Sequence, residues 1–176
     1  MNWEALGAIG ETVAAVAVVV TLGYLAVQIR QNTKSIRAST FQALSQNWVN
    51  WMSSNSRSDV FPVIYKGSSD PASLSDSEVF QYLTIARSMF RGYENDYYQF
   101  SQGTFDAEAW SGYRNSLRNE VLCYPGFRAM WIADRGNYNE AFVEFVDKEL
   151  ELSQEREASD FLTHFRSQFA APAVPD

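Results

Sequence analysis

The sequence of 176 residues has one cysteine and one histidine. A single cysteine excludes an internal disulfide and any zinc site that needs several thiolates, and it suits a reducing compartment such as the cytoplasm. Cys123 stands in the apolar stretch Val121–Tyr124, with no histidine or cluster of cations beside it to activate the thiol. We therefore expect Cys123 to be a buried structural residue.

Acid–base chemistry has few candidates in this chain. General acid–base catalysis draws most often on histidine, and His164 stands close to the C-terminus. We expect it to be exposed or held by a structural partner. The sequence contains no convincing Ser-His-Asp set, no paired-histidine spacing and no glycine-rich phosphate loop. It therefore predicts no catalytic residue, no metal site and no cofactor, and a non-enzymatic protein.

Positive charge is scarce in most of the chain. Of 14 Lys and Arg residues, three stand at Arg30, Lys34 and Arg37, and of 21 Asp and Glu residues two stand at Glu4 and Glu11. The remainder holds 11 basic against 19 acidic residues, a formal charge of −8. Because neutralisation of phosphates supplies most non-specific nucleic-acid affinity, we expect no nucleic-acid partner.

One long apolar run dominates the N-terminus. The 18 residues from Thr12 to Ile29 carry no charge. At about 1.5 Å per residue an α-helix of this length spans about 27 Å, close to the thickness of the hydrocarbon core of a bilayer. The run therefore predicts a transmembrane helix, with the lipid bilayer as its partner.

The charges around the span predict its orientation. A cleaved signal peptide carries its positive charge before the apolar run, whereas here Glu4 and Glu11 precede it without any Lys or Arg. The three basic residues follow the span, so the positive-inside rule places the N-terminus outside and everything from Arg30 onward in the cytoplasm. We expect an uncleaved, single-pass membrane protein.

A stripe of mostly small residues runs along one side of the predicted span. Gly10 and Ala14 form a small-xxx-small pair, which lets two membrane helices approach closely. One interpretation is a homo-oligomer interface, and the other is that Gly and Ala are common in membrane helices. The residues of this stripe are Gly7, Gly10, Ala14, Ala17, Thr21, Tyr24 and Gln28.

A pore is the alternative form of such an oligomer. Glu11 lies about 28 Å along the helix from Arg30, which places it at the outer interface and not at the midplane. It borders Gly7 and Ala14, so in an oligomer it would ring an outer pore mouth. Either it is a solvated interface residue, or Glu11, Thr21 and Gln28 line a pore.

The helical pattern continues beyond the span. No Gly or Pro occurs between Arg30 and Met52, and apolar residues keep a helical spacing, so the first helix exceeds forty residues. Its second part is a stalk or packs onto a domain. We expect an all-α protein with a transmembrane helix over 1–30, a juxtamembrane stalk helix over 31–55, a helical domain over 56–152, and an amphipathic helix with a flexible tail over 153–176.

Several local signals define helices within the domain. Ser75 and Glu78 have capping-box spacing ahead of an apolar-periodic run. Asp106 predicts the N-cap of a helix that continues through Val121 and ends before Pro125. Further helices are predicted at 60–65, 127–132, from about residue 138, and across an apolar stripe around 161–169. No stretch shows a sustained β-strand alternation.

The best candidate for a polar pocket lies on the helix that begins after Ser75. Arg87, Arg91, Glu94 and Asp96 stand among aromatic residues, and the first three are neighbours on one helix face. They form either a pocket in an aromatic wall or structural ion pairs that fix helix packing.

Two stretches carry a resemblance to other proteins. They are the run YLAVQIRQN at 24–32 and the run FRGYEN at 90–95, together with Trp110 and Trp131. With them the chain resembles a broad group of uncharacterised bacterial proteins that have one N-terminal span and a small helical domain. The resemblance implies an inner-membrane location and transfers no activity.

In layout alone, the chain is also similar to small membrane accessory proteins of RNA-targeting CRISPR systems, which join one span to a cytoplasmic helical domain and form pores. Those proteins resemble HEPN domains, whose signature is an arginine followed after four to six residues by histidine. Here seven residues separate Arg156 from His164. The likeness therefore implies a pore-like architecture and not a ribonuclease.

These observations predict a membrane-anchored, non-enzymatic protein. We expect it to self-associate through its transmembrane helix and to present an acidic cytoplasmic domain to a protein partner. The alternative is a homo-oligomeric membrane pore or channel.

Overall fold

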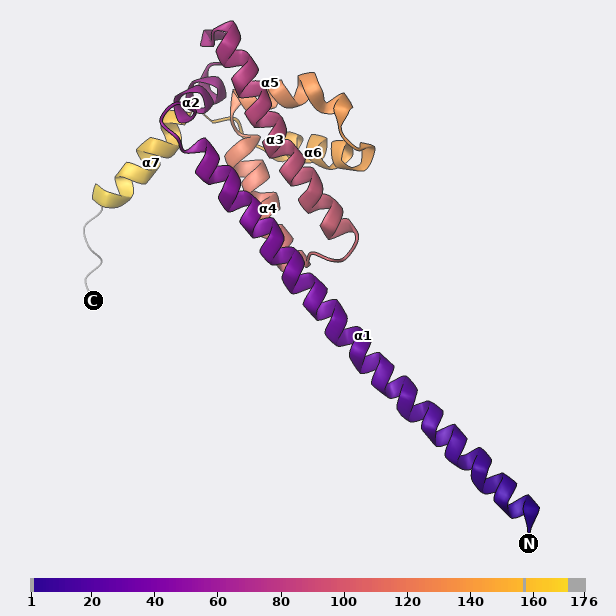
Figure 1. The fold of residues 1–176 in the computed structure, drawn as a ribbon. Helices are drawn as coiled ribbons and strands as arrows, with labels where there is room; N and C mark the ends of the chain where they lie inside the picture. Colours follow the sequence, from indigo (N-terminus) through magenta and orange to yellow (C-terminus); the bar gives the residue numbers. More distant parts are fainter. Residues whose placement is uncertain (1, 157, 171–176) are drawn as a thin grey trace.

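One very long helix, α1, sets the shape of the molecule in the computed structural model, which describes residues 2–156 and 158–170 (Figure 1). Helix α1 runs from Trp3 to Asn55 as 53 residues without a break. At about 1.5 Å per residue this is about 80 Å. Within the two described ranges there is no β-strand, so the predicted all-α fold class and the long first helix are confirmed.

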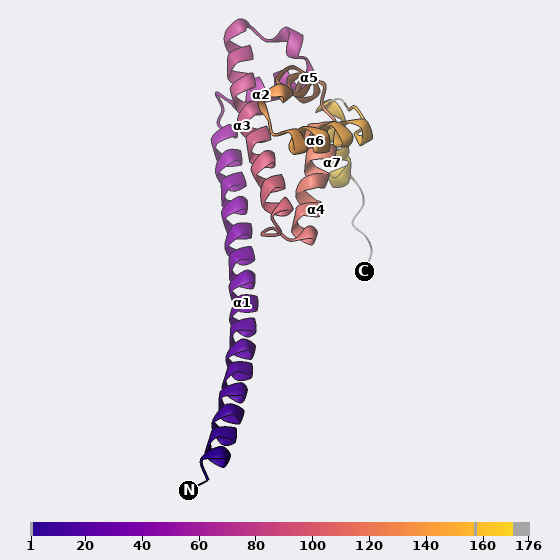
Figure 2. The ribbon, with the colours of Figure 1, turned by 90° about the vertical axis from the view of Figure 1, so that its right-hand side faces the viewer.

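Only the C-terminal part of α1 contacts the rest of the chain. Among the described side chains of α1, the first buried one is Leu44, which packs with Phe105 and Trp110. Earlier on α1, the Arg37 Nε donates to the Gly103 carbonyl oxygen at 3.1 Å, and Phe41 lies 6.3 Å from the Phe105 ring. In both ribbon views the N-terminal half extends away from the other helices (Figures 1 and 2). Residues 31–55 therefore continue the helix and then pack along the domain.

The next two helices follow from local sequence signals. Helix α2 covers Phe61–Ser69, and a 3₁₀ turn at Pro71–Ser73 leads to α3, which covers Asp76–Ser101. The capping box predicted at Ser75 is present, because the Glu78 Oε2 accepts from the Ser75 backbone N–H at 2.7 Å. Helix α3 ends at Ser101, and Gly103, two residues later, has a φ of 70° in the left-handed region that glycine adopts readily.

The predicted helix from Asp106 to Pro125 begins as expected but is not one α-helix. The Asp106 side chain caps α4, Ala107–Ser116, by accepting from the Ala109 N–H at 2.9 Å. One π-helical turn, Leu117–Val121, then follows, and the Leu122 N–H donates to the Leu117 carbonyl oxygen at 2.8 Å. The π-turn inserts one extra residue, so both Leu117 and Leu122 become completely buried.

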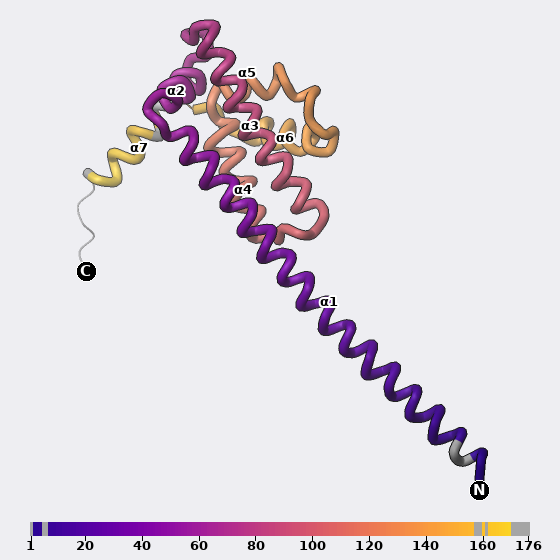
Figure 3. Tube along the Cα trace, in the orientation of Figure 1, coloured from indigo at the N-terminus to yellow at the C-terminus, as the bar shows by residue number. Residues whose placement is uncertain are grey.

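Three further helices complete the chain. Helix α5 covers Pro125–Asp134, a 3₁₀ turn covers Arg135–Asn137, and α6 covers Glu140–Leu152 with Asn139 as its N-cap. Helix α7 covers Ala158–Ala170 and contacts α2. The trace in Figure 3 shows α7 on the opposite side of α1 from α6 in this view. The predicted flexible tail, 171–176, lies outside the described residues.

The core is aromatic. Phe90 and Trp131 are completely buried with ring centroids 5.1 Å apart, and Phe142 meets Trp131 edge to face at 5.7 Å. Burial of one aromatic side chain removes about 150–250 Å² from water. These rings come from α3, α5 and α6, so their contacts hold the domain together.

Candidate functional site

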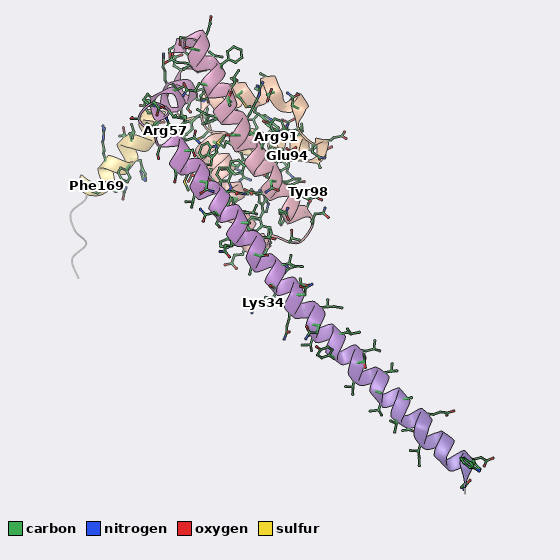
Figure 4. All side chains as sticks on the ribbon, viewed as in Figure 1. Lys34, Arg57, Arg91, Glu94, Tyr98 and Phe169 are labelled. Carbon is green, nitrogen blue, oxygen red and sulfur yellow. The ribbon has the colours of Figure 1, made fainter. Side chains whose placement is uncertain are left out.

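Among the described helices, only α1 contains a stretch that is long and apolar enough to cross a membrane. Its most apolar window has a mean hydropathy of 2.1 and none of it is buried within the molecule. Lys34 lies beyond this stretch, on the part of α1 before the helix reaches the domain (Figure 4). A single helix can therefore anchor this protein in a bilayer.

The predicted oligomer stripe is exposed along α1. Added Cβ atoms at Gly7 and Gly10 would meet no atom within 4 Å. The Thr21 hydroxyl donates to the Ala17 carbonyl oxygen of its own helix at 2.8 Å. Nothing in the single chain tests self-association or a pore lined by Glu11, Thr21 and Gln28, so both stay predictions. The residues of the stripe are Gly7, Gly10, Ala14, Ala17, Thr21, Tyr24 and Gln28.

The residues predicted as a pocket on α3 are joined to other parts of the domain by one ion pair and by hydrogen bonds. Arg87 binds Asp134 of α5 in a bidentate pair, with Nε to Oδ2 at 2.9 Å and Nη2 to Oδ1 at 2.8 Å. The Arg87 guanidinium lowers the pKa of the Asp134 carboxyl, which is also hydrogen-bonded by Asn137. This pair fastens α3 to α5.

Arg91 and Glu94 lie on the side of α3 that faces α6 (Figure 4). The Arg91 Nη1 donates to Glu94 at 2.6 Å, and its Nη2 donates to the Asn137 carbonyl oxygen at 2.9 Å. The other Glu94 oxygen accepts from the Asn139 N–H at 2.8 Å, where α6 begins. Both side chains line a surface hollow of about 390 Å³, whereas Arg87 does not. The cluster therefore holds α6 in place beside this hollow.

Asp96, which the sequence groups with this cluster, lies elsewhere. Its carboxylate is 2% exposed and accepts from the Trp48 Nε1 of α1 at 2.7 Å. The Trp48 ring lies 4.6 Å from the Tyr93 ring, and a Cβ at Gly92 would come within 3.3 Å of it. Burial raises the pKa of Asp96 to about 6 despite the hydrogen bond from Trp48. This contact fixes α1 against α3.

Asp96→Asn is expected to stabilise the fold at neutral pH by about 1–2 kcal/mol, because an amide keeps the acceptor for Trp48 without burying a charge. The native pKa, about 6, lies above the unfolded value near 3.8, so the native state holds its proton more tightly. The contribution of Asp96 to the free energy of unfolding is therefore fully present at low pH and is lost as the pH rises through 6.

Urea unfolding at several pH values, monitored by tryptophan fluorescence, measures this effect. The difference between Asp96→Asn and wild type should be largest at neutral pH and vanish near pH ~4. Asp70→Asn, at an exposed carboxylate, is the matched control. A difference that does not change with pH would contradict the assignment.

An aromatic cavity lies where α1 meets the domain. It has a volume of about 640 Å³ and is bounded by the end of α1, by α2, α3 and α4, by the π-turn, and by Leu162 of α7. Eight of its lining side chains are aromatic, and they include Trp48, Trp51, Tyr93 and Tyr113. A volume of 300–1,000 Å³ with apolar walls and few polar groups is typical of a small-molecule site.

A short chain of hydrogen bonds supplies the polar side of this cavity. The Tyr93 hydroxyl donates to the Ser116 Oγ at 3.3 Å, and the Ser116 hydroxyl donates to the Glu120 Oε2 at 2.7 Å. Glu120 is exposed and belongs to the π-turn. Among the described lining residues it is the only charged one. Ser116 thus orients a carboxylate at the rim of an aromatic cavity.

The neighbouring arginines are held on another face of the helix. Arg114 and Arg118 both bind Glu149 of α6, which is completely buried. The Arg114 Nε donates to Oε1 at 2.8 Å and the Arg118 Nε to Oε2 at 2.6 Å. Neither Glu149 nor the cavity is predicted from the sequence, because no local pattern marks a carboxylate whose partners lie more than thirty residues away.

The single cysteine and histidine lie outside these features. Cys123 is buried, as predicted, and burial raises the pKa of its thiol. His164 is exposed on α7. In the part of the chain that the structure describes, no group of three or more His, Cys, Asp or Glu side chains could hold a metal ion.

Comparison of the chain with models of known protein families, with curated proteins and with solved structures gave no match.

Proposed function

We propose that this protein is non-enzymatic, is anchored in a membrane by α1, self-associates through that helix, and presents its acidic helical domain to a partner. The observation that carries the proposal is the length of apolar helix without internal contacts. The apolar run ends at Ile29, and the first buried side chain of α1 is Leu44. Since apolar surface of this extent is unfavourable in water, a bilayer or further copies of the helix must cover it.

The proposed orientation places the domain in the cytoplasm, next to the membrane surface. Arg30, Lys34 and Arg37 follow the apolar run, as the positive-inside rule requires for a cytoplasmic side. Arg37 also binds Gly103 in the turn between α3 and α4. It lies seven residues after Arg30, about 10 Å along the helix. The inner membrane of a bacterium is the membrane that this layout suits.

Self-association rests on the stripe of small residues and on its exposure. In lipid, small side chains allow helix backbones to approach and to form extensive van der Waals contact. The open space around Gly7 and Gly10 leaves this side of α1 available to a second copy. The acidic surface of the domain would remain accessible to a partner in such an assembly.

Gly10→Leu is expected to weaken self-association about tenfold or more, because a branched side chain would separate the helices at their closest approach. Cross-linking in washed membranes, together with the mass of the purified particle in detergent, measures the change. Wild type should exceed the mass of one 20.0 kDa chain, and the variant should move toward it.

Val16→Leu is the matched control, since it also enlarges an exposed side chain of the same span but lies off the stripe. A wild-type particle that is strictly monomeric would refute self-association, and equal masses above that of one chain for all three proteins would refute the stripe as its interface. Loss of the protein from washed membranes would refute the anchor itself.

A further inference from the structure

We propose that the cavity between α1 and α4 binds a small apolar organic cation, an amine or ammonium compound with an aromatic or branched body. The site is independent of self-association through the N-terminal half of α1. Three properties of the cavity favour such a ligand. They are an aromatic wall, one oriented carboxylate, and a described lining without basic side chains.

The aromatic wall comes first from α1. Trp48 and Trp51 lie with ring centroids 5.8 Å apart at an interplanar angle of 67°, and Trp48 also lies 6.4 Å from Tyr113. Rings inclined to one another present both faces and edges to a ligand. The faces of Trp and Tyr attract a cation that lies within about 6 Å of the ring centroid, most strongly where water is excluded.

The carboxylate of Glu120 gives the cavity rim a negative charge. Ser116 binds one of its oxygens at 2.7 Å, so that the carboxylate is held at the rim on the face of α4 that lines the cavity. That face also contributes Ala109, Gly112 and Tyr113. An anionic ligand would meet a like charge there, and a cation would meet a partner.

The arginines of the same helix are directed elsewhere. Arg114 and Arg118 each bind an oxygen of the buried Glu149, and their guanidinium groups stay with α6. The described lining consequently contains no Lys, Arg or His. Since the chain beyond Arg37 carries a formal charge of −8, its field also favours the approach of cations.

The π-turn is the element that places Glu120. It carries Glu120 and Val121, and both line the cavity. Single π-turns within α-helices occur frequently at functional sites, because the extra residue re-aims side chains. Here it lets the helix direct Arg118 to Glu149 while Glu120 remains at the cavity rim.

Three probes with one aromatic body distinguish the charge preference. Naphthylmethylamine is a cation at neutral pH, naphthylmethanol is neutral and naphthoate is an anion. Calorimetric titration uses the full chain in phosphatidylcholine nanodiscs, with empty nanodiscs subtracted. We expect the amine to bind about tenfold or more tightly than naphthoate, with the alcohol between them.

Glu120→Gln should reduce the affinity for the amine to about that for the alcohol. Glu144→Gln, at an exposed residue of α6 outside the cavity, removes the same charge and should leave the preference unchanged. Equal binding of naphthoate and the amine by wild type, or no binding of any probe, would overturn the proposal.

Gly112→Leu tests whether the probes enter this cavity. A Cβ at Gly112 meets nothing within 4 Å, so a leucine there would fill the cavity and not strain the helix. We expect binding of the amine to be lost. Ser111→Leu adds the same side chain on an exposed face of α4 and should bind as wild type. Undiminished binding by Gly112→Leu would place the probe elsewhere and refute the site.

Discussion

Gly126→Ala is expected to destabilise the helical domain by about 3 kcal/mol or more, a large fraction of the stability of a domain of this size. A Cβ at this position would overlap the Gly67 carbonyl oxygen. That atom belongs to the backbone of α2, so a side-chain rotation cannot relieve the clash. Helices α2 and α5 must separate, and the movement of α5 also disturbs the packing of its Phe127 on Tyr82 of α3, where the ring centroids lie 5.5 Å apart.

Denaturant unfolding of the full chain in detergent measures this effect, with Gly112→Ala as the control. Alanine at Gly112 occupies open space within α4, so it should leave stability unchanged or raise it by up to about 1 kcal/mol. If Gly126→Ala unfolds at the same denaturant concentration as Gly112→Ala, the close approach of α2 and α5 does not exist as described.

Glu149→Ala is expected to cost about 3–5 kcal/mol, because it removes the shared partner of two arginines from a completely buried position. Arg114 and Arg118 keep 42% and 25% of their side chains exposed, so both can turn partly toward water. That relaxation places the expected cost nearer the lower end of the range. Glu149→Gln should lie between alanine and wild type, since an amide accepts hydrogen bonds without the charge.

Thermal unfolding, monitored by circular dichroism, measures this cost. A control variant that removes an exposed acidic side chain separates it from the effect of losing a negative charge. Glu144→Gln lies on the exposed face of the same helix, where a substitution changes stability by about 0.5 kcal/mol or less. A cost for Glu149→Ala as small as this would mean that the two arginines do not depend on Glu149.

Predictions from local patterns agree with the structure where the interactions are local. The capping box at Ser75 joins residues three positions apart, and Asp106 caps α4 through the backbone of Ala109. The continuous first helix follows from the lack of Gly and Pro beyond Arg30. Each of these features depends on neighbours within one helical turn, so the sequence contains the complete signal.

The predictions are incomplete where a side chain binds a residue that is distant in the sequence. Spacing alone placed Asp96 in one group with Arg91 and Glu94, whereas Asp96 instead binds Trp48 of α1. The uninterrupted helical pattern after Asp106 likewise gave no sign of the π-turn at Leu117–Val121. In both places the outcome depends on a helix that packs from far along the chain, and periodicity does not describe such contacts.

The sequence by itself therefore determined the all-α class, the membrane-compatible helix and the excess of acidic residues, because composition and helical period specify them. Only the tertiary structure decided which carboxylates are buried, that Gly67 and Gly126 bring two backbones together, and that an aromatic cavity forms between α1 and α4. The physical reason is that burial and cavities arise from the mutual arrangement of helices, and many arrangements are compatible with one pattern of apolar residues.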